Sequence, residues 1–287
     1  MIPYSGQLQE LQATRAAVID RLMLTPDAAM SQRVAWHGQD LELRTLFYLL
    51  VEDDERRICQ LQALRVETEQ GQTPVQRILA RGCLTRGQLR AALLAFPDAR
   101  LDETPAPGEW TVREVLGHCL NVEHRYLAQT LYAVGRLARA PQPPMRMPDV
   151  GLPPRVPGAP PPGAVADLLT QLDVIRASLI THALPWGETE LAAPTAWNAW
   201  DIDVAFRLHR FASHEREHTI QIAKTLRWLG HAPTEAQQIL ARAQEVRGEL
   251  EGLLIGLRPQ GEVQELLQTM QVEEQAMAAD IRALANA

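Results

Sequence analysis

The segment FRLHRFASHEREHTIQIAKTLRWLG, residues 206–230, predicts a long amphipathic helix that carries histidines at the edge of its buried face. At about 100° per residue, its apolar side chains fall within a sector of about 60° that begins at Phe211. His214 and His218 are four residues apart and lie at the margin of this sector. Their imidazoles are therefore about 6 Å apart along the helix axis and can reach one ion. His209 falls on the opposite side and is expected at the surface.

A second segment, VREVLGHCLNVEHRYL at residues 112–127, predicts another amphipathic helix with one histidine at its buried edge. On the same helical projection, His118 borders the apolar face and His124 faces solvent. If the two helices pack side by side, His118, His214 and His218 converge inside the protein. Three neutral imidazoles with an open coordination position are a recognised ligand set for a divalent metal. The alternative is that each is a separately hydrogen-bonded core histidine.

His214, Glu215 and His218 also match the HExxH pattern, in which the glutamate of a metalloprotease is the general base. Glu215 is therefore the candidate catalytic residue, either as a proton acceptor or as a carboxylate that orients His118. A surface or structural role for Glu215 is the alternative. The sequence lacks the glycine and histidine of the extended metzincin pattern, and no strand is evident that could hold an extended peptide. A peptidase is therefore disfavoured.

Composition excludes several classes of protein. The 287 residues are 46% hydrophobic, which is enough apolar material for a core. Their formal net charge of −7 has the wrong sign for binding nucleic acid or an anionic membrane. The widely spaced Cys59, Cys83 and Cys119 suggest neither a disulfide framework nor a thiolate metal site. No leader and no membrane-spanning run is evident. We therefore expect a cytoplasmic protein without nucleic-acid or membrane partners.

Apolar spacings of three and four residues favour helix nearly everywhere else. Helices are expected over residues 85–96, 111–138, 164–182 and 201–230. The first is predicted to open with a capping box at Thr85 and Gln88, and the second with one at Thr111 and Glu114. Residues 140–163 hold ten of the 20 prolines, so no helix can pass through them. This order predicts an all-α four-helix bundle with one long Pro-rich crossover.

Helical hairpins are predicted on both sides of this bundle. The stretches LFYLLVEDDERRICQLQAL (46–64) and LLQTMQVEEQAMAADIRAL (266–284) share their apolar spacing and a Val-Glu-acidic step. Because a lone hairpin cannot bury its apolar face, the two are expected to pair as a degenerate second bundle. The predicted domains are an N-terminal hairpin at 1–70, the bundle with the metal site at 85–232, and a C-terminal hairpin at 233–287.

Residues 85–232 resemble the DinB-like family of four-helix bundles, which includes metal-dependent hydrolases of the YfiT type. The resemblance rests on GEWTVREVLGHCLNVE (108–123), the long crossover, WNAWDIDVAFRLH (197–209) and HEREHTIQIAKTLRWLG (214–230). It implies one metal-ligating histidine on the second helix and a pair on the fourth, which correspond to His118, His214 and His218. It also implies a bacterial-type protein with zinc, nickel or iron. Some members are thiol-dependent transferases that use bacillithiol or mycothiol.

These observations favour a divalent-metal-binding protein that transfers a low-molecular-weight thiol to a small electrophile. Cys119 falls on a packed helix face and the other cysteines outside the bundle, so an external thiol would have to supply the sulfur. The first alternative is a non-catalytic metal- or ligand-binding helical scaffold. The second is an HExxH-type metal-dependent hydrolase that uses Glu215. The expected partners are a small-molecule substrate and, in a homodimer, a second copy of the chain.

Overall fold

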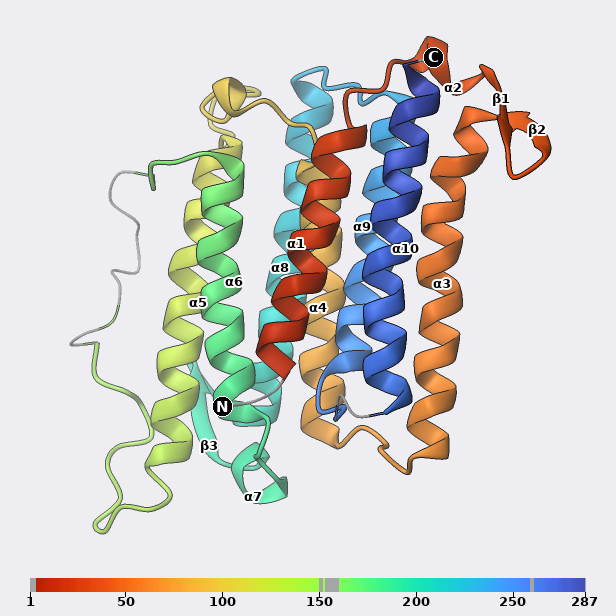
Figure 1. Cartoon of the computed structure of the whole chain (residues 1–287). Coiled ribbons are helices and arrows are strands. Elements are labelled where there is room, and N and C mark those ends of the chain that lie inside the picture. Colours follow the sequence, from red (N-terminus) through yellow and green to blue (C-terminus); the bar gives the residue numbers. More distant parts are fainter. Residues whose placement is uncertain (1–3, 150–151, 153–159, 259–260, 287) are drawn as a thin grey trace. The chain divides into compact units, whose positions relative to one another are not determined.

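The computed structural model describes residues 4–149, 152, 160–258 and 261–286 (Figure 1). Helices dominate these residues, and their strands form only two short antiparallel pairs. The prediction of an all-α protein is therefore confirmed. Within the same ranges, no helix is long and apolar enough to cross a membrane.

The chain divides into two compact units. Unit 1 comprises residues 1–71, 90–95 and 232–287, and unit 2 comprises residues 72–89 and 96–231. Unit 1 is therefore assembled from both ends of the sequence.

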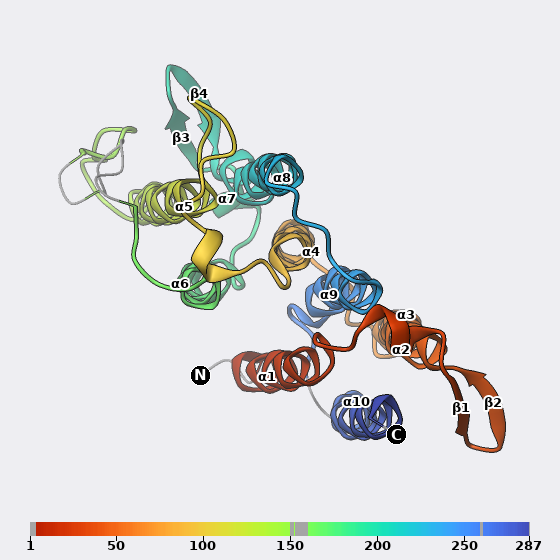
Figure 2. The same ribbon diagram turned by 90° about the horizontal axis from the view of Figure 1, so that it is seen from above.

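Unit 2 contains the predicted four-helix bundle. Its long helices are α4 (Pro74–Leu93, of which the residues after Leu89 belong to unit 1), α5 (Val112–Gly135), α6 (Val165–Ala183) and α8 (Val204–Trp228). Helix α5 packs against both α6 and α8, and Figure 2 shows these helices end-on. A 3-10 turn (Asp98–Arg100) precedes α5, and the short helix α7 (Glu188–Leu191) follows α6.

Helix α4 begins at Pro74, well before the predicted start. Its capping box is formed by Thr73 and Gln76: the Gln76 N–H donates to Thr73 Oγ1 over 3.3 Å and the Thr73 N–H donates to Gln76 Oε1 over 3.1 Å. The predicted capping box at Thr85 was wrong. Thr85 lies in the middle of α4, where its side chain is buried and its hydroxyl donates to Glu215 Oε2 over 2.6 Å. A threonine with a tertiary partner has the same local sequence pattern as a capping threonine.

Helix α5 begins as the sequence predicted. The Glu114 N–H donates to Thr111 Oγ1 over 3.2 Å, and the Thr111 N–H donates to Glu114 Oε2 over 2.8 Å. These two bonds satisfy donors that the first turn of a helix otherwise leaves unpaired.

A β-hairpin that the sequence did not predict precedes the longest helix of each unit. Strand β1 (Arg33–Trp36) pairs with β2 (Gln39–Glu42) ahead of α3 (Leu43–Glu67), and β3 (Pro194–Trp197) pairs with β4 (Trp200–Asp203) ahead of α8. Four residues are too few for an alternating pattern to stand out. The turns contain Gly38 and Asn198 at positive φ, which glycine and asparagine accept readily. Asp203 then caps α8 by accepting the Phe206 N–H over 2.7 Å.

The order and length of the elements repeat along the chain. The elements α1 (Tyr4–Leu22), α2 (Asp27–Met30), β1, β2, α3 and α4 each have a counterpart of equal length that starts 161 positions later, at α6, α7, β3, β4, α8 and α9 (Glu235–Leu254). Helix α5 likewise equals α10 (Glu262–Ala285) in length. The sequence ILAR occurs at 78–81 and again at 239–242. The chain therefore contains an internal tandem repeat.

Each unit combines parts of both repeats. In unit 1, α3 packs against α9 and α10, and α1 packs against the same two helices. Leu11, Leu46, Leu250 and Ile281, one from each helix, are fully buried. The predicted pairing of the terminal hairpins is thus confirmed. The similarity of residues 46–64 and 266–284 suggested that α3 and α10 are equivalent. By position and length, α3 instead corresponds to α8, and α10 corresponds to α5.

Candidate metal centre

Three imidazoles converge between α5 and α8. Nε2 of His214 lies 3.1 Å from Nε2 of His118 and 3.0 Å from Nε2 of His218. One ring nitrogen from each of the three lies within 4.8 Å of those of the others. Nitrogen ligands of a tetrahedral zinc ion, about 2.0–2.1 Å from the metal, are about 3.3–3.4 Å from one another. The three side chains therefore suit a single divalent ion with little rearrangement.

Hydrogen bonding and burial prepare these rings to bind a cation. The Nδ1–H of His218 donates to Gln221 Oε1 over 2.8 Å, which leaves the Nε2 lone pair pointing to the other rings. Burial, followed by the neighbouring His218 and His118, lowers the pKa of His214 to about 3. Burial also lowers the pKa values of His118 and His218. All three are therefore neutral near pH 7, the form that binds metals.

Aromatic rings flank the three imidazoles. The Trp110 ring is stacked at 6.4 Å from the His218 ring and tilted at 5.1 Å from the His118 ring, centroid to centroid. On another side, the Tyr126 ring contacts His214 edge-on at 5.8 Å. Trp110 thus partly covers the three imidazoles.

A cavity of about 460 Å³ adjoins the histidines. Its lining includes His118 and His214, the hairpin residues Thr195, Ala196, Trp197 and Asn198, and Arg146, Met147 and Asp149 from the crossover. Small-molecule sites occupy volumes of about 300–1,000 Å³, so the cavity can hold a small ligand against the imidazoles.

Two arginines of α8 give this cavity a cationic wall. Arg207 is 1% exposed, lies over the Tyr126 ring at 5.1 Å and donates to the Ala196 carbonyl. Its burial lowers its pKa to about 10, so the guanidinium is still charged at pH 7. Arg210 lies over the Trp197 ring at 4.9 Å. Neither arginine was predicted from the sequence, although Arg207 lies about 20° from His214 on the helical projection, which is a detectable signal.

Comparison with known families identifies this bundle. Residues 84–222 match the model of the DinB superfamily. This segment is a DinB-superfamily domain. Neither the curated proteins nor the solved structures gave a match. The superfamily is a metal-binding helical fold, and the match includes the three convergent histidines.

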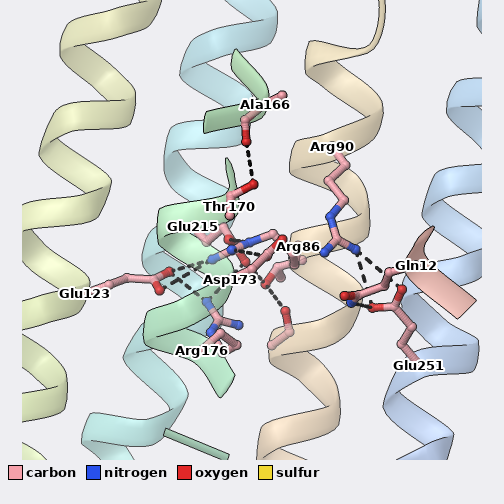
Figure 3. Close-up of polar contacts among 12 residues, drawn as sticks. Gln12, Arg86, Arg90, Glu123, Ala166, Thr170, Asp173, Arg176, Glu215 and Glu251 are labelled. Carbon is pink, nitrogen blue, oxygen red and sulfur yellow. Dashed lines mark hydrogen bonds and ion pairs between the residues drawn. The ribbon is translucent and has the colours of Figure 1, made fainter. Parts of the chain in front are cut away.

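The Glu215 side chain of the DinB domain points into a buried ion-pair cluster (Figure 3). Its carboxylate accepts from Arg86 Nε over 2.6 Å, from Thr85 Oγ1 over 2.6 Å and from Arg176 Nη2 over 3.4 Å. Burial opposes its ionisation, but the two guanidinium charges outweigh that effect and hold the pKa of Glu215 below its ordinary value. These contacts favour the structural alternative for Glu215 over a role as proton acceptor.

Glu123 on α5 completes this cluster of the DinB domain. It accepts from Arg176 Nη2 over 2.7 Å and from Arg86 Nη2 over 3.3 Å, and Arg86 also pairs with Asp173 over 2.6 Å. Burial, only partly offset by the arginines, raises the pKa of Glu123. The four central side chains come from α4, α5, α6 and α8, so the cluster joins every long helix of the bundle. Glu123, Arg86 and Arg176 were not predicted as functional residues from the sequence, because nothing local marks which helix faces will meet.

Proposed function

We propose that the DinB domain binds one divalent metal ion through His118, His214 and His218 and catalyses transfer of a low-molecular-weight thiol to a small electrophile. The observation that carries the proposal is the convergence of three neutral imidazoles at the wall of a cavity large enough for a small molecule. Zinc, nickel and iron are the candidate metals, because all three accept imidazole ligands. A divalent ion held there would supply Lewis-acid chemistry that lowers the pKa of a bound thiol or water.

The protein's own residues would bind and orient the reactants. Arg207 and Arg210 line the cavity and suit a carboxylate or another anionic group on the thiol or the electrophile. Trp110 would limit the access of water to the imidazoles. Gln221 would hold His218 in the tautomer that leaves Nε2 free.

The state of the protein's cysteines supports an external thiol as the source of sulfur. The Cys119 thiol is buried, and that burial raises its pKa well above the ordinary value, so it is a poor nucleophile. Cys83 lies in α4 within unit 2 and not outside the bundle, and it too is buried. Cys59 is exposed but belongs to unit 1.

The contacts of Glu215 argue against the HExxH-type hydrolase. A general base must reach the proton that it abstracts, whereas Thr85, Arg86 and Arg176 surround this carboxylate. A non-catalytic metal- or ligand-binding scaffold is therefore the main competing outcome of the test.

The test begins with the metal content of the purified protein. Wild type should contain about one divalent metal per chain, and His118→Ala, His214→Ala and His218→Ala should each lose most of it, because three ligands leave little redundancy. His209→Ala and His124→Ala are matched controls on the same two helices, since both side chains are exposed. Full occupancy in His118→Ala would disprove the ligand assignment.

Activity is tested next, with bacillithiol, mycothiol and glutathione as thiols and a panel of small electrophiles. Turnover should need metal and thiol together and should survive Cys119→Ser. A rate no higher than that of His214→Ala for every pair would reject the transferase and leave the scaffold.

A further inference from the structure

The repeat places a counterpart of each metal-site residue in unit 1. Asp53 occupies the position of His214, and Arg57 occupies that of His218. Alignment of α10 with α5 through Glu274 and Glu123 matches Thr269 with His118. Unit 1 therefore does not reproduce the three imidazoles.

The buried ion-pair cluster, by contrast, is present in both units. In unit 1, Arg15 pairs with Asp54 over 2.5 Å and with Glu274 over 2.7 Å. Arg247 pairs with Asp54 over 3.0 Å and with Glu274 over 2.6 Å. Their counterparts are the cluster residues of unit 2, namely Arg176, Glu215, Glu123 and Arg86.

The two units differ in how a cavity meets this cluster. In unit 2, the Tyr126 and Phe211 rings contact each other at 5.5 Å and Arg176 lies over Phe211, while none of the four cluster residues lines the described part of the cavity. In unit 1, Met277 and Leu50 replace the two rings. There a cavity of about 350 Å³ is lined by all four cluster residues. We attribute the contact between this cavity and the cluster to the loss of the ring pair.

Hydrogen-bond donors at the base of the unit 1 cavity lack acceptors. Nη1 of Arg15 and Nη1 of Arg247 are buried and have no hydrogen-bond partner among the described residues. Each arginine side chain is only 2% exposed. An unpaired buried donor costs free energy, so a ligand whose acceptor atoms reach these two nitrogens would be stabilised in the cavity.

The charges around the cavity determine what kind of ligand can bring those acceptors. Five carboxylates but only three guanidinium groups line it, so an anion is disfavoured. At its more exposed side, the Trp36 Nε1–H donates to Asp280 over 3.1 Å, whereas the nearby Asp53 and Glu273 pair with Arg56 and Arg57. Carboxylates beside an indole ring suit an organic cation.

We infer that unit 1 contains a second small-molecule site, for an organic cation that also carries uncharged hydrogen-bond acceptors such as hydroxyl groups. The acceptors meet Arg15 and Arg247 at the base of the cavity, and the cationic group lies beside Asp280 and Trp36. The site does not depend on the metal of the DinB domain. The repeat thus has one copy of the bundle for metal chemistry and one for recognition of a cation.

The inference is tested by calorimetric titration of the full-length protein with three sugars of similar size and different charge. Glucosamine combines an ammonium with hydroxyl groups and should bind saturably, glucose should bind more weakly, and glucuronate should bind least. Choline, a cation with one hydroxyl, is a second positive probe. Equal affinities for the three sugars, or no saturable binding of either glucosamine or choline, would overturn the inference.

A cavity-filling variant locates the binding. Leu50→Phe with Met277→Tyr introduces the ring pair that unit 2 already accommodates, so the variant should fold while losing at least about tenfold in affinity for glucosamine. Val272→Ala, at an exposed position of the same helix α10, is the matched control. His214→Ala should bind glucosamine normally, which separates failure of this site from failure of the metal site. Unchanged affinity in the filled variant would contradict the assignment.

Discussion

His214 and Glu215 are adjacent in the sequence, yet they serve different parts of the DinB domain. One residue turns a side chain by about 100° around a helix, so the imidazole reaches the cavity while the carboxylate reaches the ion-pair cluster. The HExxH pattern records the spacing of the two histidines correctly. It does not tell whether the glutamate between them faces the same site.

Removing the Glu215 carboxylate should therefore act on stability. Glu215→Ala leaves Arg86 and Arg176 short of a counterion in a buried site, and we expect a loss of about 3–5 kcal/mol in the free energy of unfolding, measured by urea denaturation. The folded fraction should keep its metal. His209→Ala, on the exposed face of the same helix, should change stability little. Unchanged stability together with lost metal would place Glu215 at the metal centre instead.

The buried imidazoles predict a pH-dependent stability for the metal-free protein. The pKa of His214 is about 3 in the folded state and about 6.5 in the unfolded chain, so between these values only the unfolded chain binds the proton. The neutral His214 therefore costs no stability above about pH 6.5. As the pH falls from 6.5 toward 3, the free energy of unfolding of the metal-free protein decreases. Urea denaturation with a chelator should show a shallower pH dependence for His214→Gln than for wild type. Parallel pH dependences of the two proteins would contradict the lowered pKa of His214.

Among the elements, α5 carries both a clear start signal and one of the three convergent histidines. The capping box of Thr111 and Glu114 fixes its first turn, and His118 follows less than two turns later. Helix α4 shows the limit of such signals, because Thr85 has capping-type spacing and yet serves a tertiary hydrogen bond. The hairpin of β3 and β4 contributes to the cavity beside His118, since it brings Trp197 to the cavity wall.

Loss of the α5 cap should weaken the metal centre indirectly. Thr111→Ala removes the acceptor for the Glu114 N–H, and we expect a loss of about 1 kcal/mol in stability and somewhat weaker metal binding. Thr111→Ser keeps the hydroxyl and should behave like wild type. Thermal denaturation with and without added zinc measures both effects. Equal stability of the alanine and serine variants would show that the cap contributes nothing.

At the scale of the whole molecule, the two repeats are combined so that each unit draws on both. Unit 1 takes α1 and α3 from one end of the chain and α9 and α10 from the other. Its apolar core therefore cannot form from either end alone.

Truncation of the chain after His231 should expose this dependence. Without α9 and α10, helices α1 and α3 lose the surfaces that bury Leu11 and Leu46, and their amides should lose protection from hydrogen exchange. Helices α5 and α8 should stay protected and should still bind metal. Persistent protection of α3 in the truncated chain would contradict the assembly of unit 1 described above.

The sequence by itself determined the helical class, the bundle of residues 85–232, the pairing of the terminal hairpins and the three convergent histidines. Helical periodicity is local, so it reports which side chains share a face, and two faces bearing histidines were enough to predict the metal centre. The tertiary structure decided the rest: the buried cluster around Glu215 and the guanidinium of Arg207 in the cavity. Each of these depends on contacts between residues far apart in the chain, and a periodic pattern holds no information on which distant face will meet it.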